Sequence, residues 1–350
     1  MKAFVLLLAL LAPLRALPHP LLNDIHSQLN ASEQFEVVRP VTVKELRKAV
    51  WKAQREGRGI SIQGGGHSMG GQQYGKGSLH VDTSGMNKLI SLDEKRAVAV
   101  VEAGIQWPAL IEALHAAQGD NPFPLTIRQK QTGADNMSIG GALSSNVHGR
   151  GLRFAPFVED VESFWLMGAN GREIHCSRLE HPELFRRAIG GYGLFGIITR
   201  VELRLVPRQK LERQVELATV ENVVELLVRK SAEGAVYGDF QFSIDGASPT
   251  FLRNGIVSTY HALPNDAVMP EGEKELGAND WKELYRLAHF DKAGAYERYV
   301  SYYLSTDRQR YWSDTAQLSV YLPDYHAAID AAAHAKVKGS EMISELYVPR

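Results

Sequence analysis

The clearest chemical signal in this chain is a run of glycines that ends in a histidine and a serine. Residues 63–68 read Gln-Gly-Gly-Gly-His-Ser, and seven of the fourteen residues from Gly64 to Gly77 are glycine. Such a run can hold a diphosphate through backbone N–H groups, because glycine permits close approach and positive φ. The imidazole of His67 and the hydroxyl of Ser68 add a nucleophile or a base. The loop therefore predicts an anion-binding site with a reactive side chain beside it.

Two further glycine-rich stretches follow the first. The second reads Gln131-Thr-Gly-Ala-Asp-Asn-Met-Ser-Ile-Gly-Gly141 and continues to Asn146-Val-His-Gly149, so we expect a loop over 133–151. The third is Gly190-Gly-Tyr-Gly-Leu-Phe-Gly-Ile-Ile-Thr199. Each stretch alone could be a turn that only joins two elements. Together, three convergent loops could wrap one long ligand.

Gly66-His-Ser-Met-Gly70 also fits the nucleophile elbow of secreted esterases and lipases. In that motif a serine stands on a tight turn between a strand and a helix. Residues 60–62 supply the strand, but the glycines of residues 71–77 do not favour a helix. A secreted serine hydrolase that uses Ser68 is therefore an alternative function.

Gly191-Tyr-Gly-Leu-Phe-Gly196 matches the glycine pattern of dinucleotide-binding folds. That pattern works when a strand precedes the glycines and a helix follows them. Here residues 181–189 predict a helix and residues 197–206 a strand, so the order is reversed and no nicotinamide site is expected. The twelve histidines are scattered along the chain, and we predict no catalytic metal.

Composition excludes several other classes of protein. The 350 residues are 44% apolar and 23% charged, which is typical of a globular chain. The net charge of -1 leaves no basic field for a nucleic-acid partner. Cys176 is the single cysteine, so an intrachain disulfide and a cysteine-rich zinc site are both excluded.

The N-terminus has the pattern of a secretory signal peptide. Lys2 precedes an apolar run over 3–12, and Ala16 provides a small-residue exit, so we expect a signal peptide over 1–16. The apolar run is too short to cross a bilayer, which takes about 20 residues. We therefore expect a secreted or periplasmic protein without an integral membrane span in the mature chain.

The elements expected between residues 37 and 207 alternate between strands and helices. Thr42-Val-Lys-Glu45 predicts a capping box, and four apolar residues follow at helical spacing: Leu46, Ala49, Val50 and Ala53. Further helices are predicted at 107–117 and 181–189, and extended segments or strands at 37–40, 60–62, 79–81, 97–101, 164–167, 173–176 and 197–206. Asn170-Gly171 is typical of a hairpin turn. This alternation indicates an α+β or α/β domain.

From Gln209 onward the pattern indicates a second sheet covered by helices. Strands are predicted at 215–217 and 236–244, with a helix over 219–232 between them. Eleven of the thirty aromatic residues lie between Trp281 and Tyr325. We expect most of these rings to form core, with the wall of a substrate pocket as the alternative.

Six motifs in register resemble the vanillyl-alcohol-oxidase-like flavoproteins with a PCMH-type FAD-binding domain. They are Val38-Arg-Pro40, the Gly-Gly-Gly-His-Ser loop, Asp82 with Met86-Asn87-Lys88, Val101-Glu-Ala-Gly104 with Trp107, Ser138-Ile-Gly-Gly141, and Gly190 to Thr199. The resemblance covers about Phe35 to Pro207. It implies an α+β fold: a two-subdomain FAD-binding domain over 33–207 and a truncated substrate-cap domain over 208–350.

The resemblance also implies which residues contact FAD. The residues so implied are Gly64, Gly65, Gly66, His67, Ser68, Gly133, Asn136, Ser138, Gly140, Gly141, His148, Gly149 and Ile198. His67 stands where many relatives attach the flavin 8α-methyl carbon to a histidine nitrogen, so we expect a covalent link there. Relatives with two attachments add a cysteine in the second loop, which this chain lacks, so we expect one attachment. The alternative for His67 is a turn histidine beside FAD that is bound without a covalent link.

The activity implied by the resemblance is oxidation of a CH–OH or similar group of a small hydroxylated substrate. Hydride would pass to flavin N5, and oxygen or another acceptor would reoxidise the flavin. We expect His148 and Glu345 to take catalytic roles, with a satisfied loop histidine as the alternative for His148. Ser344 to Tyr347 resembles the cap strand of aldonolactone and alditol oxidases, except that Tyr347 replaces their arginine. Family members continue past this strand, so an inactive flavin-binding remnant is a further alternative.

Overall fold

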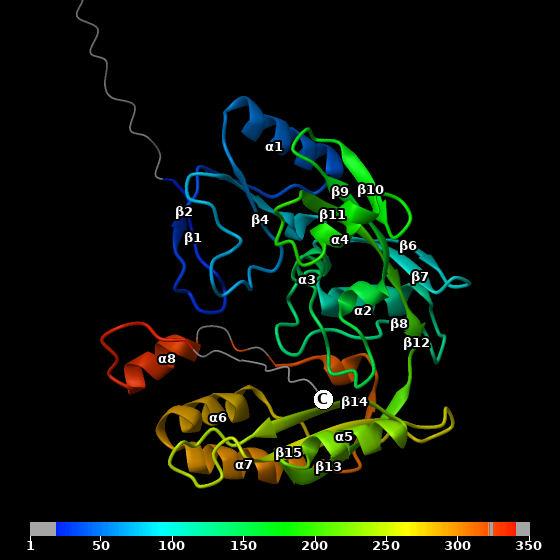
Figure 1. Cartoon of the computed structure of the whole chain (residues 1–350), viewed down its shortest axis with the longest axis vertical. Helices are drawn as coiled ribbons and strands as arrows, with labels where there is room; N and C mark the ends of the chain where they lie inside the picture. Colours follow the sequence, from blue (N-terminus) through cyan, green and yellow to red (C-terminus); the bar gives the residue numbers. More distant parts are fainter. Residues whose placement is uncertain (1–18, 321, 323–324, 341–350) are drawn as a thin grey trace, which may run out of the picture.

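The computed structural model describes residues 19–320, 322 and 325–340, which form an upper and a lower unit (Figure 1). The helices are α1 (Val43–Arg55), α2 (Trp107–Ala117), α3 (Ile139–Ser145), α4 (Pro182–Ala188), α5 (Val223–Ala232), α6 (Ala278–Phe290), α7 (Lys292–Leu304) and α8 (Tyr325–Ala332). Three 3-10 turns are η1 (Thr83–Gly85), η2 (Phe157–Asp160) and η3 (Thr315–Gln317).

Sixteen strands are assigned within the described residues. They are β1 (Leu21–Leu22), β2 (Ser32–Glu33), β3 (Glu36–Val38), β4 (Ile60–Gln63), β5 (Leu79–Asp82), β6 (Leu89–Asp93), β7 (Val98–Glu102), β8 (Leu125–Thr126), β9 (Val161–Met167), β10 (Glu173–Ser177), β11 (Ile197–Arg204), β12 (Val206–Pro207), β13 (Lys210–Thr219), β14 (Ala235–Phe242), β15 (Asn254–Ala262) and β16 (Arg310–Trp312).

A small parallel sheet, in the order β3-β5-β4, carries the first glycine loop at the end of β4. Helix α1 begins as predicted, because the Thr42 hydroxyl accepts a hydrogen bond from the Glu45 amide at 3.2 Å. The Glu45 carboxylate accepts in return from the Val41 amide at 3.0 Å, one residue before the predicted partner. The four apolar residues predicted on the buried face of the helix are all buried, and they pack against the small sheet.

A five-stranded antiparallel sheet, in the order β10-β9-β11-β7-β6, forms the larger core of the upper unit. Trp107 at the start of α2 is fully buried, and its indole N–H donates to the Gln131 side chain at 2.9 Å. The β9–β10 hairpin forms as predicted, but of the Asn-Gly pair only Gly171 has a positive φ, at +74°, so the turn is not the type I′ turn that this pair favours.

The second glycine stretch is not a continuous loop, which corrects the expectation for residues 133–151. Helix α3 occupies Ile139–Ser145, and the Ser138 hydroxyl caps it by accepting from the Gly141 amide at 3.1 Å. Ile139, Ala142 and Leu143 are buried at helical spacing, so tertiary packing stabilises a helix that two glycines disfavour locally.

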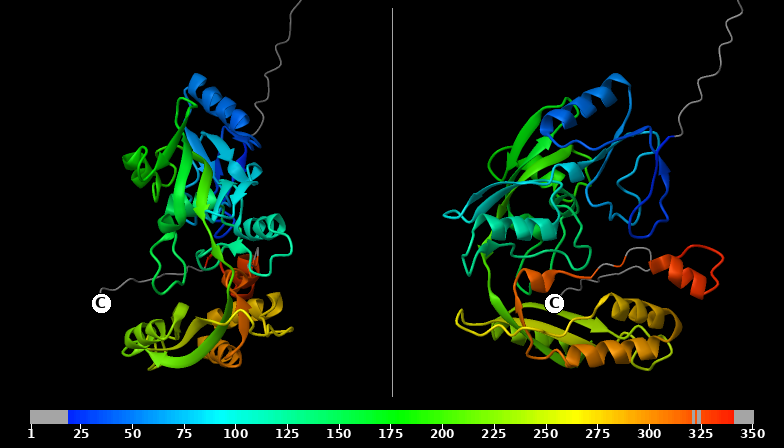
Figure 2. Two further views of the ribbon diagram at one scale, coloured as in Figure 1. Left: turned by 90° about the vertical axis from the view of Figure 1, so that its right-hand side faces the viewer. Right: turned by 180° about the vertical axis from the view of Figure 1, so that it is seen from behind.

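The lower unit is an antiparallel sheet in the order β14-β15-β13-β16, with helices on both faces. Leu226 of α5 packs with Ala218 and Val257 on one face. Tyr303 of α7 approaches Arg213 on the other face, because alternate strand residues point to opposite sides. Figure 2 shows the chain entering this unit after the green β12 and leaving it in the orange segment after β16.

The aromatic residues between Trp281 and Tyr325 form the expected core only in part: Trp281 and Tyr285 pack against the buried cluster of Tyr325, and Tyr311 packs against another buried cluster. Among those that the structure describes, Tyr325 alone falls in the buried class, at 9% exposure. The other described rings in this range are partly buried, except that of Phe290, which is exposed.

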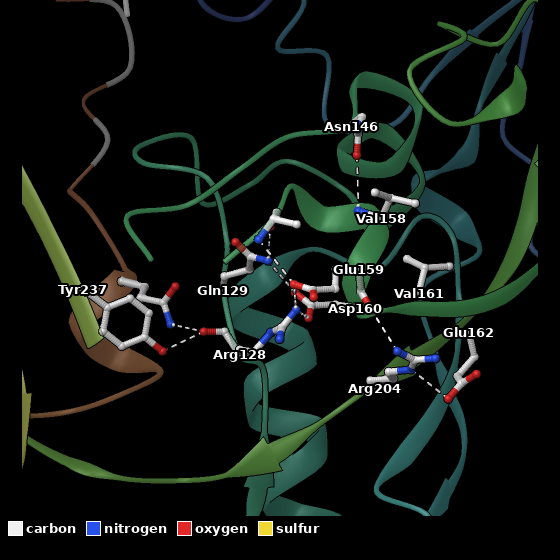
Figure 3. Close-up of polar contacts among 12 residues, drawn as sticks. Arg128, Gln129, Asn146, Val158, Glu159, Asp160, Val161, Glu162, Arg204 and Tyr237 are labelled. Atoms are coloured by element: carbon white, nitrogen blue, oxygen red, sulfur yellow. Dashed lines mark hydrogen bonds and ion pairs between the residues drawn. The ribbon is translucent and has the colours of Figure 1, made fainter. Parts of the chain in front are cut away.

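A polar network joins the two units below the larger sheet (Figure 3). The Tyr237 hydroxyl of β14 donates to the Arg128 carbonyl at 2.7 Å. Arg128 forms ion pairs with Glu159 at 2.7 Å and with Asp160. The Gln129 side chain donates to the Asp160 carboxylate at 2.9 Å, so residues 128–129 are fixed by both units.

None of the helices within the described ranges has the length and apolar character needed to cross a membrane.

Candidate cofactor-binding site

A cavity of about 570 Å³ lies where the three glycine stretches meet, between the small parallel sheet and the larger sheet. Its volume falls in the range of about 300–1,000 Å³ that is common for cofactor sites. The lining residues are Ile62, Gln63, Gly64, Gly65, Gly66, His67, Ser68, Met69, Gly70, Gln72, Gln73, Thr83, Ala103, Met137, Gly140, Gly141, Ser144, Ser145, Tyr192, Gly193, Gly196, Ile197 and Ile198. Segments that are more than a hundred residues apart in the sequence therefore line the same cavity.

Two of the glycines in the first loop are required by contact with the second stretch. A Cβ atom on Gly64 would lie 1.9 Å from the Ser138 hydroxyl oxygen, and one on Gly65 would lie 2.1 Å from the Asn136 carbonyl oxygen. Only Gly66 of the three has a positive φ, at +73°. Gly64 and Gly65 therefore also allow the two loops to pack, a role that the sequence did not predict.

The third stretch is tied to the second by backbone hydrogen bonds. The Gly190 amide donates to the Leu143 carbonyl at 3.1 Å, and the Tyr192 amide donates to the Ser144 carbonyl at 3.0 Å. The second stretch therefore contacts the first through Asn136 and Ser138 and the third through helix α3. This contact closes the cavity on one side.

The chemistry of the lining fits FAD. The lining residues include hydroxyl groups and glycine amides, and none of those that the structure assigns to the cavity is an aspartate, glutamate, lysine or arginine. A diphosphate would therefore be held by N–H and O–H donors and would meet no carboxylate. Ile62, Ile197 and Ile198 supply apolar surface for the aromatic ring systems.

His67 is the one titratable imidazole in the cavity lining that the structure assigns. Burial lowers the pKa of His67 to about 4, with His26 acting in the same direction and Asp24 opposing it. The imidazole is therefore neutral at pH 7. A neutral imidazole has a free electron pair and can act as a nucleophile.

The structure brings together eight of the thirteen residues predicted to contact the cofactor. Those that line the cavity are Gly64, Gly65, Gly66, His67, Ser68, Gly140, Gly141 and Ile198. Asn136 and Ser138 lie behind the first loop and support it, and Gly133 is outside the lining. His148 and Gly149 are also outside it, in a segment that continues to a hydrogen bond from the Leu152 amide to the Val236 carbonyl of β14. Glu345 lies outside the described residues.

Other lining residues were not singled out from the sequence. Met69, Gln72 and Gln73 extend the first loop, and Ser144 and Ser145 end α3. The two serines could have been predicted only together with a helix over residues 139–145, because the C-terminal turn of this helix places both serines near the cavity.

The structure does not form the nucleophile elbow around Ser68. The stretch between β4 and β5 consists of turns, and no helix occurs there among the residues described. The Ser68 carbonyl instead accepts from the Gly71 amide at 3.1 Å, which closes a turn. The strand, serine and helix order of a hydrolase is therefore not present at this serine.

Comparison with known proteins agrees with the geometry of the cavity. The FAD binding domain family matches residues 36–177. The chain is 30% identical to L-galactono-1,4-lactone dehydrogenase 1 of Oryza sativa subsp. japonica over 212 residues, 59% of this chain and 34% of that protein. It is 27% identical to L-gulonolactone oxidase of Bos taurus over 190 residues, 54% of this chain and 41% of that protein.

A solved structure shares the fold at low sequence identity. Alkyldihydroxyacetonephosphate synthase superposes with a TM-score of 0.54 and 18% identity, over 67% of this chain and 49% of that one. The matched regions span about a third to two fifths of these two curated relatives. Residues 36–177 match the PCMH-type FAD-binding family, and the chain is related to the aldonolactone oxidases and dehydrogenases.

Proposed function

We propose that this protein is an FAD-dependent oxidoreductase that oxidises a CH–OH group of a small hydroxylated substrate. The observation that carries the proposal is the cavity in which three glycine stretches meet, the first two of them within the residues that match the FAD binding domain family. The names of the relatives refer to aldonolactones. A sugar-derived alcohol or lactone is therefore the proposed substrate class, and oxygen or another acceptor takes the electrons.

Bound FAD would supply a hydride acceptor for the carbon that carries the hydroxyl group. The amides of Gly64, Gly65 and Gly66 and the hydroxyl of Ser68 are proposed to bind the diphosphate. Ile198 is proposed to contact the adenine end. His148 and Glu345 keep their proposed roles as the residues that take the substrate proton or bind the substrate.

We propose one covalent attachment, from His67 to the flavin 8α-carbon. Two observations support it: His67 lines the cavity, and its imidazole is neutral at pH 7. The attachment would raise the tendency of the flavin to accept hydride and would prevent loss of the cofactor. No cysteine occurs in the second glycine stretch for a second attachment.

We also propose that residues 1–16, which lie outside the described residues, are a signal peptide and that the protein acts outside the cytoplasm. A covalently held cofactor suits such a location, because lost FAD could not be replaced from the cell. The proposed domains are 33–207 for FAD and 208–350 for the substrate cap.

Anaerobic reduction tests the proposed activity. Purified protein carrying FAD is mixed with a panel of aldonolactones and sugar alcohols, and the visible flavin band is followed. At least one compound is expected to bleach the band, and air is expected to restore it. A protein that holds FAD but is bleached by none of these, although dithionite reduces it, would be a flavin-binding protein without this activity.

A further inference from the structure

An N-terminal segment, residues 19–30, holds the first glycine loop on both sides of His67. We call this segment the strap. The Ile25 amide donates to the Gly66 carbonyl at 3.1 Å, just before His67. The Asn30 side chain donates to the Met69 carbonyl, just after Ser68. Strap residues therefore hold the backbone on both sides of His67, and this backbone positions the imidazole.

Asp24 organises the strap from its interior. Its carboxylate is 1% exposed and accepts from the His26 amide at 3.1 Å, the Ser27 hydroxyl at 2.8 Å and the Asn30 amide group at 2.9 Å. Burial alone would raise the pKa of Asp24, but the hydrogen bonds from Asn30 and Ser27 lower it below the ordinary value of a carboxyl group. The strap therefore places the buried negative charge of Asp24 beside the loop that carries His67.

The other side of the strap rests on the C-terminal part of the described chain. The His26 and His326 rings meet edge to face at 5.8 Å, and His326 hydrogen-bonds the His26 carbonyl. Tyr325 of the same helix stacks on Tyr285 of α6 at 4.5 Å. In Figure 1, α8 lies between the strap side of the upper unit and α6. The strap is thus held between the glycine loop and α8.

The charge of Asp24 has the sign that attachment of FAD at His67 requires. A neutral imidazole becomes positively charged when its free electron pair forms a bond to carbon. Asp24 precedes Ile25, whose amide bonds the Gly66 carbonyl next to His67. Its charge favours the cationic form of His67, whereas burial and His26 disfavour that form. A fixed carboxylate near a developing cation lowers the barrier to its formation.

We propose that the strap is a positioning element for flavin attachment, in which Asn30 holds the loop and Asp24 stabilises the developing positive charge on His67. This inference rests on the proposed covalent link. The reaction forms a C–N bond and breaks one C–H bond of the 8α-methyl group and one N–H bond of the imidazole. The two electrons and two protons pass to the flavin ring and then to dioxygen, which becomes hydrogen peroxide.

The test separates attachment from binding. Full-length protein produced in riboflavin-depleted cells is mixed with FAD in air, and acid-precipitable flavin is measured with time over a range of FAD concentrations. Asp24→Asn and Asn30→Ala are expected to lower the rate at saturating FAD about tenfold each, which corresponds to about 1.4 kcal/mol of barrier. The FAD concentration that gives half the maximal rate should stay unchanged, because neither residue lines the cavity.

Asp93→Asn is the matched control. The Asp93 carboxylate also accepts from backbone amides in a turn, at 3.1 and 3.0 Å, but it is exposed at the end of β6. This variant should attach FAD at the wild-type rate, and the melting temperature of each apoprotein checks that the variants fold.

Four results would overturn the inference. The first is an attachment rate within about twofold of wild type in both strap variants. The second is a rise in the half-saturating FAD concentration while the maximal attachment rate stays unchanged. A wild-type chain that binds FAD but never attaches it overturns the strap inference and leaves the proposed oxidoreductase in place. Acid-stable flavin in His67→Ala overturns both the strap inference and the attachment site.

Discussion

Replacing His67 with alanine is expected to abolish acid-stable flavin while FAD still binds reversibly. The imidazole is the neutral nucleophile in the cavity lining, so no other side chain assigned to the lining replaces it. The rest of the lining is unchanged by the substitution, and the glycine amides and serine hydroxyls remain available to the diphosphate. Flavin should move from the acid pellet to the supernatant, as measured by its visible absorption and by the mass of the denatured chain.

His175→Ala is the control for this substitution. His175 lies on β10 and pairs with Glu180 at 2.8 Å, away from the cavity. This variant should keep all of its flavin in the pellet. Flavin that stays in the pellet of His67→Ala would place the attachment elsewhere, and flavin in the supernatant of the wild type would mean that FAD is not covalently held.

Replacing Asp314 with alanine is expected to lower the free energy of unfolding by about 3–5 kcal/mol, because breaking a buried ion pair leaves charges without a partner. The Asp314 carboxylate is fully buried. It accepts from Arg208 at 3.0 Å and from the Thr126 hydroxyl at 2.9 Å, and it pairs with His115 at 2.9 Å. These partners come from α2, β8 and the segment after β12, so one carboxylate joins the two units.

Denaturation of the apoprotein in urea measures this effect. Glu183→Ala removes an exposed carboxylate that faces Arg187 along α4, and it should change the unfolding free energy by less than about 1 kcal/mol. An Asp314→Ala protein as stable as Glu183→Ala would show that this contact does not hold the units together.

Local sequence signals predicted most of the upper unit. Helix α2 has the predicted bounds, and α1 buries the four residues that its period selects. These helices could be predicted because their apolar spacing and their capping residues agree with the fold. Helix α3 was missed because Gly140 and Gly141 suggest a loop, whereas its stability comes from burial of Ile139, Ala142 and Leu143.

The structure of the strap and of much of the lower unit could not be predicted from local sequence patterns. The strap has no regular period, and its hydrogen bond from Asn30 to Met69 joins residues 39 positions apart. Strand β15 is buried at six consecutive positions, so it lacks the alternation that marks a half-exposed strand. Such contacts depend on tertiary packing and not on local pattern.

The sequence predicted which loops form the candidate site, but it did not predict the contacts between these loops. The sequence selected the first glycine loop, and the structure places Gly64 to Ser68 in the cavity wall. Loop packing adds a requirement for glycine at Gly64 and Gly65 that was not expected, because their close neighbours are Ser138 and Asn136. That requirement is visible only when both loops are in place.

The flavin content of the purified chain tests the central claim most directly. Wild-type protein is supplied with FAD, and bound flavin per chain is compared with that of Ser145→Trp, which puts a large ring into the cavity, and Ser91→Trp, which puts one on the exposed side of β6. We expect one FAD per chain in wild type and in Ser91→Trp, and binding weakened at least about tenfold in a folded Ser145→Trp protein. A folded wild-type chain that takes up no flavin, or a Ser145→Trp protein that binds it equally well, would contradict the account.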